Sequence, residues 1–143
     1  MRCAGRGKRK PLKVVIDTNA LISALLFGGK PGELISLWKT GEIIPFFSPD
    51  TFAEFTAVLS YPKFKLTKDE TRLIIEEETL PYFEVLEPPN SRLNLCRDPD
   101  DDKFLALAVS AEADFIITGD DDLRSIGKHG KIKILTVAEF LGL

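Results

Sequence analysis

The ten residues 13–22 constrain the fold of this chain more than any other stretch, because an apolar run ends abruptly there in an acid. Residues 14–16 are three consecutive β-branched residues, apolar on both faces of an extended chain, which is typical of a central strand in a parallel sheet. A helix should follow, with Thr18 or Asn19 as its N-cap. Ligands of open α/β sheets bind beyond the carboxyl ends of the strands. Asp17, at such an end, is therefore either a helix cap or part of a site.

The same pattern recurs near the C-terminus, which favours the second interpretation. The apolar residues 115–117 are followed by Thr118, Asp120 and Asp122. Between the two runs, four aspartates among residues 98–102 open another helix. One or two acids there stabilise the helix dipole, but four repel one another unless a cation neutralises them.

These acids define a candidate metal site. Asp17, Asp101 or Asp102, and Asp120 or Asp122 follow strands or open a helix, and Glu54 lies in a predicted helix over 50–59. Carboxylates without histidine or cysteine partners suit Mg²⁺ or Mn²⁺ rather than zinc or copper. The single histidine, in a predicted turn over 127–130, weakens any mechanism built on a histidine base.

The alternation of elements predicts the fold class. Strands are expected at 14–16, 43–47, 83–86, 115–117 and 132–135, with helices between and after them. The glycine- and proline-rich residues 27–32 should break the chain before a helix over 33–39. This order predicts a three-layer α/β domain with a five-stranded parallel sheet flanked by helices and joined by right-handed crossovers.

Length and charge divide the chain into two parts. A chain of 143 residues accommodates one domain, residues 13–143, preceded by a basic arm, residues 1–12. Six cations precede the first acid, which leaves 13 basic and 22 acidic residues, a formal charge of −9, for the remainder. The arm is either a solvated tail or a flexible segment that holds an anionic polymer.

Other features narrow the class of protein. The two cysteines, Cys3 and Cys96, have no metal-ligand spacing and predict neither a disulfide framework nor a zinc site. No apolar run approaches the roughly 20 residues that span a bilayer, and the basic N-terminus lacks a secretory signal pattern. We expect a cytoplasmic protein without a membrane partner.

The ordered set of motifs resembles the PIN domain family. The set consists of the strand ending in Asp17-Thr-Asn19, then Glu54 before a Tyr-Pro-Lys-Phe turn, then the acidic helix start before Phe104, and finally Phe115-Ile-Ile-Thr-Gly-Asp120. It is especially similar to the prokaryotic VapC-like branch, the toxin ribonucleases of toxin–antitoxin systems. The resemblance extends from Lys13 to about Leu141, and the basic arm is its one departure.

The resemblance implies a site and an activity. It assigns the four family acids to Asp17, Glu54, Asp101 and Asp120, a further metal ligand to Asp122, and polar helpers to Asn19 and Thr118. Asp102, the next residue, remains an alternative to Asp101 as the family acid at this position. The implied activity is a Mg²⁺- or Mn²⁺-dependent endoribonuclease, with RNA as substrate, a cognate antitoxin as partner and a homodimer as assembly. The arm, with Lys103, Lys128, Lys131 and Lys133, is expected to contact phosphates.

Two other classes of function are compatible with the sequence. One is a PIN domain that binds RNA or a protein partner without cleaving, although the intact set of acids argues against it. The other is a metal-dependent phosphatase or DNase, because the acids indicate phosphoryl chemistry more strongly than they indicate a substrate.

Overall fold

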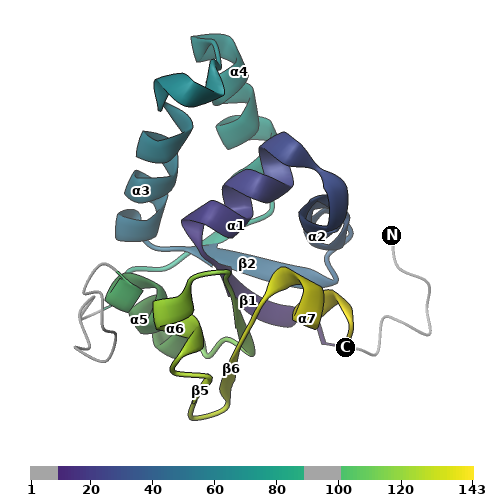
Figure 1. The fold of residues 1–143 in the computed structure, drawn as a ribbon, viewed down its shortest axis with the longest axis vertical. Coiled ribbons are helices and arrows are strands. Elements are labelled where there is room, and N and C mark those ends of the chain that lie inside the picture. Colours follow the sequence, from purple (N-terminus) through teal and green to yellow (C-terminus); the bar gives the residue numbers. More distant parts are fainter. Residues whose placement is uncertain (1–9, 89–100) are drawn as a thin grey trace.

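The computed structural model describes residues 10–88 and 101–143, arranged around one six-stranded sheet with the order β3-β2-β1-β4-β6-β5 (Figure 1). The first five of these strands run parallel, and β5 pairs antiparallel with β6 at the edge. The strands are β1 (Leu12–Ile16), β2 (Ile43–Phe47), β3 (Glu84–Val85), β4 (Phe115–Ile117), β5 (Lys128–His129) and β6 (Ile132–Leu135). The basic arm up to residue 9 and the aspartates at 98 and 100 lie outside the described residues.

Helices connect the strands and cover both faces of the sheet. They are α1 (Thr18–Ile22), continued by the π-helical η2 (Ser23–Phe27), α2 (Gly29–Lys39), α3 (Pro49–Leu59), the 3₁₀ turn η3 (Pro62–Phe64), α4 (Lys68–Leu73), continued by the π-helical η4 (Ile74–Thr79), α5 (Asp102–Ala111), α6 (Asp121–Arg124) and α7 (Val137–Leu141). In Figure 1, α1 to α4 rise above the sheet and α5 lies below it.

Alternate residues of β1 face two separate cores, as expected for a central strand. Val14 and Ile16 pack in one core with α1, α2, α3 and α7, whereas Val15 packs in the other with α5 and α6. Residues 14–16 are at most 5% exposed. The predicted three-layer α/β architecture is therefore confirmed, and it brings the ends of β1 and β4 together in the middle of the sheet.

The sheet has one strand more than the five predicted. Lys128 and His129, expected in a turn, pair with Lys133 and Ile132 as β5. Gly130, with a φ of 59°, provides the left-handed conformation that reverses the chain between the two strands. Because β5 has only two residues, it has no hydrophobic period by which it could be recognised.

Two helix starts also differ from expectation. Helix α2 begins at Gly29 rather than at Glu33, because Pro31 lies in its first turn, where no backbone N–H is needed. The N-cap of α1 is Asp17, not Thr18 or Asn19. Ser48, before α3, and Thr136, before α7, each cap their helix through the side-chain oxygen, which accepts from a backbone N–H of the first turn.

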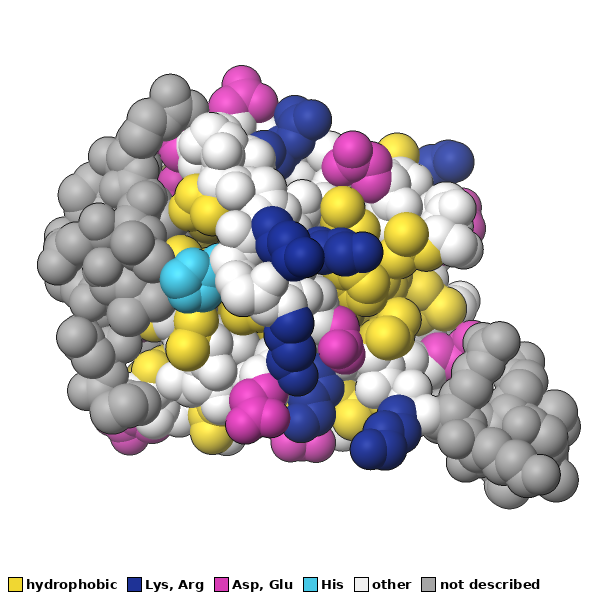
Figure 2. All heavy atoms as spheres, turned by 90° about the horizontal axis from the view of Figure 1, so that it is seen from below, with side chains coloured by type: hydrophobic (Ala, Val, Ile, Leu, Met, Phe, Trp, Pro, Cys, Tyr) yellow, Lys and Arg dark blue, Asp and Glu magenta, His cyan; other side chains and the backbone are white. Residues whose placement is uncertain are grey.

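The lysines of the β5–β6 hairpin lie away from the strand ends that carry the acids. Lys133 is in register with Phe115, the first residue of β4, whereas Thr118 follows the last residue of that strand. Lys128, Lys131 and Lys133 are exposed. Figure 2 views the molecule from below, the side of this hairpin in Figure 1, and shows Lys and Arg side chains gathered across the face.

No single helix within residues 10–88 and 101–143 is long and apolar enough to cross a membrane. Only the segments Thr18–Phe27 and Gly29–Lys39, taken together, reach the necessary length and composition, and they are bent by 96° at the break between them.

Candidate active site

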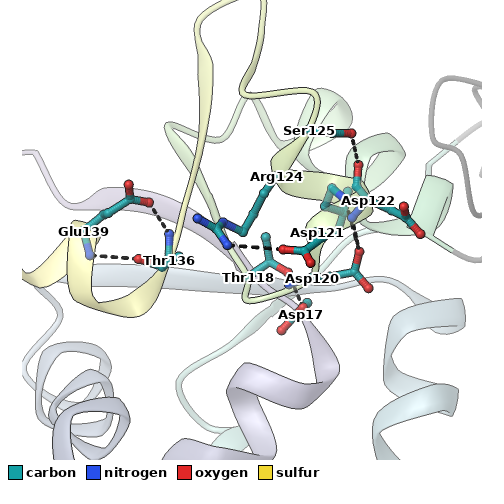
Figure 3. A network of polar contacts seen from close by, with 10 residues as sticks. Asp17, Thr118, Asp120, Asp121, Asp122, Arg124, Ser125, Thr136 and Glu139 are labelled. Atoms are coloured by element: carbon teal, nitrogen blue, oxygen red, sulfur yellow. Dashed lines mark hydrogen bonds and ion pairs between the residues drawn. The ribbon is translucent and has the colours of Figure 1, made fainter.

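The candidate site begins where β1 and β4, neighbouring parallel strands, end side by side. The backbone N–H of Asp17 donates to the carbonyl of Ile117, so the next residue of each chain segment, Asp17 and Thr118, leaves the sheet at the same level. The Thr118 hydroxyl donates to Asp17 Oδ2. Both side chains are buried, at 5% and 0% exposed. Sequence reasoning had named both residues, and the structure brings them into contact (Figure 3).

Asp17 is both a helix cap and a member of the acidic group. Its Oδ1 accepts from the backbone N–H of Ala20 at 2.8 Å, which caps α1. Burial raises the pKa of Asp17 to about 6, and repulsion from Asp120 and Glu54 adds to this, although the hydrogen bonds from Thr118 and Ala20 act in the opposite direction. Asp17 is therefore mostly ionised at neutral pH, at a cost that a nearby cation would reduce.

Asp120 is held by the start of α6. Its Oδ1 accepts from the backbone N–H groups of Asp122 at 2.7 Å and of Leu123 at 3.2 Å, as an N-cap does. Its own N–H donates to the Thr118 hydroxyl at 2.9 Å. Thr118 is thus the link between Asp17 and Asp120, since its one hydroxyl bonds to both residues (Figure 3).

Three aspartates converge beside this link. One carboxylate oxygen from each of Asp101, Asp120 and Asp122 lies within 4.8 Å of the others. Asp101 is 8% exposed and precedes the first residue of α5, whereas Asp122 belongs to α6. The neighbouring Asp102 is also buried, at 1% exposed, but the group found among the described residues contains Asp101 instead.

Glu54 reaches the site from α3 and is paired with a lysine. Lys103 Nζ lies 2.6 Å from Glu54 Oε1, and the two side chains are 16% and 33% exposed, respectively. Glu54 is close enough to Asp17 to raise the pKa of that carboxyl. Lys103 was expected to contact substrate phosphate, but in this structure it neutralises one of the predicted acids. Sequence reasoning missed this pairing, because it depends on how α3 and α5 pack.

Asn19 occupies the rim of the site. It is exposed, two residues beyond Asp17, and lines two hollows of about 530 Å³ and about 370 Å³. The second hollow also contains Gly119, between Thr118 and Asp120. The predicted helper residue is therefore on the surface next to the acids and is not one of the buried contacts.

The donor set fits a hard divalent cation. The group of three consists of aspartates alone. Asp17 is connected to Asp120 of this group through the hydroxyl of Thr118. Carboxylate and hydroxyl oxygens are the ligands that Mg²⁺ and Mn²⁺ prefer, and crowded carboxylates are stabilised by such a charge. Asp101, Asp120 and Asp122 are the residues that would hold the ion, with Asp17 and Glu54 beside them.

Known proteins resemble this chain in sequence and in fold. A family model described as PIN domain matches residues 13–122. The chain is 36% identical over 140 residues to the uncharacterized protein MJ1680 of Methanocaldococcus jannaschii, an alignment that covers 91% of this chain and 90% of the relative. The structure superposes on that of the PIN domain endonuclease Utp24 with a TM-score of 0.57 and 23% identity, covering 90% of this chain and 86% of the other. The similarity to Utp24 concerns the fold alone. The chain belongs to the PIN domain family.

Proposed function

We propose that this protein is a Mg²⁺- or Mn²⁺-dependent endoribonuclease. The observation that carries the proposal is the convergence of Asp101, Asp120 and Asp122 within 4.8 Å, beside a buried Asp17 that is hydrogen-bonded into the same group. PIN domains are typically metal-dependent nucleases, and the intact set of acids supports a cleaving rather than a merely binding member.

The chain's own residues supply a preorganised, negatively charged cluster. Thr118 fixes the position of Asp17 relative to Asp120, and the start of α6 fixes Asp120. Lys103 limits the negative charge around Glu54. A divalent ion bound by these acids would supply Lewis acidity for the hydrolysis of a phosphodiester. No histidine is needed for this chemistry, and His129 lies on β5, at the opposite end of the strands.

One assay tests the activity and the substrate class together. The purified protein is incubated with mixed single-stranded RNAs and with single-stranded DNA of the same sequences, in Mn²⁺, in Mg²⁺ or in chelator. We expect metal-dependent internal cleavage of RNA that is abolished in Asp120→Asn. Cleavage of DNA alone would reassign the substrate, and binding of RNA without cleavage in any metal would identify a non-catalytic PIN domain.

We further propose that the protein is the toxin of a toxin–antitoxin pair and works as a homodimer. The support is the ordered motif set, which resembles the VapC-like branch. Induced expression should arrest growth of a bacterial host, and the Asp120→Asn variant should not. Light scattering on the purified chain tests the dimer, and co-expression with the product of the adjacent gene tests the antitoxin.

A further inference from the structure

Beside the acids lies a hollow that is lined by aromatic side chains and a lysine. It has a volume of about 530 Å³ and is bounded by Asn19, Ile22, Ser23, Leu26 and Phe27 of α1 and η2, and by Lys63, Phe64 and Leu66 at and after η3. These lining residues include one cation, two aromatic rings and no acid. The described body around them is acidic overall, whereas the linings of this hollow and of the neighbouring one at Lys30 each contain a lysine and no acid.

The aromatic rings are arranged as a platform open to solvent. Phe27 is 69% exposed, which is unusual for so large an apolar side chain. Its ring centroid lies 6.2 Å from that of Phe64, with the planes tilted by 52°. Lys63 Nζ lies 5.1 Å from the centre of the Phe64 ring. Two rings and an exposed ammonium group therefore share one surface.

The hollow continues toward the candidate active site through Asn19. Asn19 is two residues from Asp17, and it also lines the neighbouring hollow that contains Gly119 and the exposed Lys30. Phe27 is eight residues further along the same helical segment, roughly 12 Å at the rise of an α-helix. A polymer strand whose phosphodiester lies at the acids would pass over this surface within a few of its units.

We infer that the hollow between η2 and η3 is a subsite for single-stranded RNA, in which Phe27 stacks on a base, the tilted Phe64 ring packs against the edge of that base and Lys63 holds a phosphate. The inference rests on the proposed ribonuclease function. Proteins that bind single strands combine aromatic platforms, which accept any base, with cations that follow the backbone. Lys63 adds a cation that can bind a phosphate to this aromatic surface, which favours a nucleic acid strand over an apolar protein helix as its occupant.

Binding of RNA tests the subsite independently of turnover. A fluorescein-labelled single-stranded RNA 12-mer is titrated by anisotropy in an Asp17→Asn background, so that it is not cleaved. Phe27→Ala should weaken binding by roughly 5- to 150-fold, the range found for one stacked base, and Phe27→Trp should retain it. Lys63→Gln should lower the slope of log affinity against log salt by about 0.7. Matched controls are Leu143→Ala, which removes an apolar side chain that is 76% exposed, and Arg72→Gln, which removes an exposed cation from α4.

An RNA with abasic sites separates the two roles. The effect of Phe27→Ala should disappear on abasic RNA, because no base is left to stack, whereas the effect of Lys63→Gln should persist. The Phe27→Trp variant adds a direct reading, since RNA should quench its fluorescence while the native Trp38, 2% exposed, stays unaffected.

The outcomes distinguish the subsite from the function. Suppose that the Asp17→Asn parent binds RNA and the wild type cleaves it, but that Phe27→Ala and Lys63→Gln bind RNA as tightly as this parent does. The proposed subsite is then wrong, and the proposed nuclease function is retained. If the parent binds no RNA and the wild type cleaves none in any metal, the proposed function fails and the subsite with it. Thermal melts of each variant exclude unfolding as the cause of weaker binding.

Discussion

Lys103 Nζ lies 2.6 Å from Glu54 Oε1, so a cation of the protein itself already neutralises one acid of the candidate site. Replacing this lysine leaves the pocket more negative by one charge. We therefore expect Lys103→Met to tighten Mn²⁺ binding by about threefold to tenfold, as expected for one unit charge a few ångströms away in a partly solvated pocket. Isothermal titration calorimetry measures the change.

The control for this prediction is Lys131→Met, in the exposed hairpin at the other end of the strands. It removes the same charge from the molecule without changing the pocket. Equal Mn²⁺ affinity in both variants and in the wild type would mean that Glu54 and Lys103 lie too far from the bound ion to affect it electrostatically.

Asp17→Asn should abolish cleavage and stabilise the metal-free fold at neutral pH. The pKa of Asp17 is about 6 in the folded protein and 3.8 for an ordinary aspartate. The native state therefore holds the proton more tightly than the unfolded state does. Above pH 6, the ionised carboxyl lowers the free energy of unfolding by about 3 kcal/mol, whereas below pH 3.8 it is protonated in both states and has no such effect. In chelator, the free energy of unfolding of the wild type should fall as the pH rises through this window.

The asparagine variant lacks this titration, so its curve should be flatter between pH 3.8 and 6 and should lie above the wild-type curve at pH 7. Urea denaturation at a series of pH values measures both. A variant that cleaves RNA at the wild-type rate would reduce Asp17 to a helix cap, and an unchanged pH dependence would contradict the raised pKa.

Thr118→Val tests the link between Asp17 and Asp120. Valine has nearly the same shape but removes the hydroxyl that donates to Asp17 and accepts from the N–H of Asp120. Leaving these buried groups without a partner should cost about 1–3 kcal/mol of stability. Because the Thr118 hydrogen bond lowers the pKa of Asp17, its removal should move the pH-dependent window upward.

Thr118→Ser keeps the hydroxyl and removes only a methyl group, so it is the matched control. Denaturation curves and RNA cleavage are measured for both. If the serine variant were as inactive as the valine variant, the packing of the methyl group would matter more than the hydrogen bonds.

The strand ends were predictable because they depend on local sequence. Residues 14–16 and 115–117 are β-branched or aromatic runs that end in polar residues, and parallel strands bring such ends to one edge of a sheet. Asp17 and Thr118, both named from the sequence, accordingly lie in contact in the structure.

The rest of the site depends on packing between helices. The pairing of Glu54 with Lys103 requires the relative placement of α3 and α5, which no local pattern encodes. Asp101 and Asp102 are adjacent and equally acidic, and only the observed start of α5 decides that Asp101 joins the other aspartates. The hollow at Phe27 was missed because it forms between segments far apart in the sequence, although the alternation of aromatic and basic residues at 61–65 was a usable signal.

Mn²⁺ should stabilise the fold through the acidic group. A ligand that binds only the native state adds about 2.7 kcal/mol at a hundredfold excess over its Kd, which corresponds to roughly 5–10 °C in a domain of this size. The shift should vanish in a variant that carries Asp17→Asn, Asp101→Asn and Asp120→Asn together. Asp121→Asn, in the first turn of α6 but outside the group, should retain it. A shift of the same size in the triple variant would mean that the ion binds elsewhere.

Deleting residues 1–10 should weaken RNA binding without removing any candidate ligand. The deletion removes five of the six cations that precede Asp17, and the residues from Asp17 onward have a formal charge of −9, so the arm is the part of the chain best suited to attract an anionic polymer toward the acidic group. For every phosphate that the arm binds, the deletion should lower the slope of log affinity against log salt by about 0.7 on a single strand. The rate of cleavage at saturating RNA should change far less than the affinity, because residues 1–10 include none of the candidate acids. Anisotropy across a salt series compares the deleted form with the full chain, and superimposable curves would show that the arm takes no part in binding.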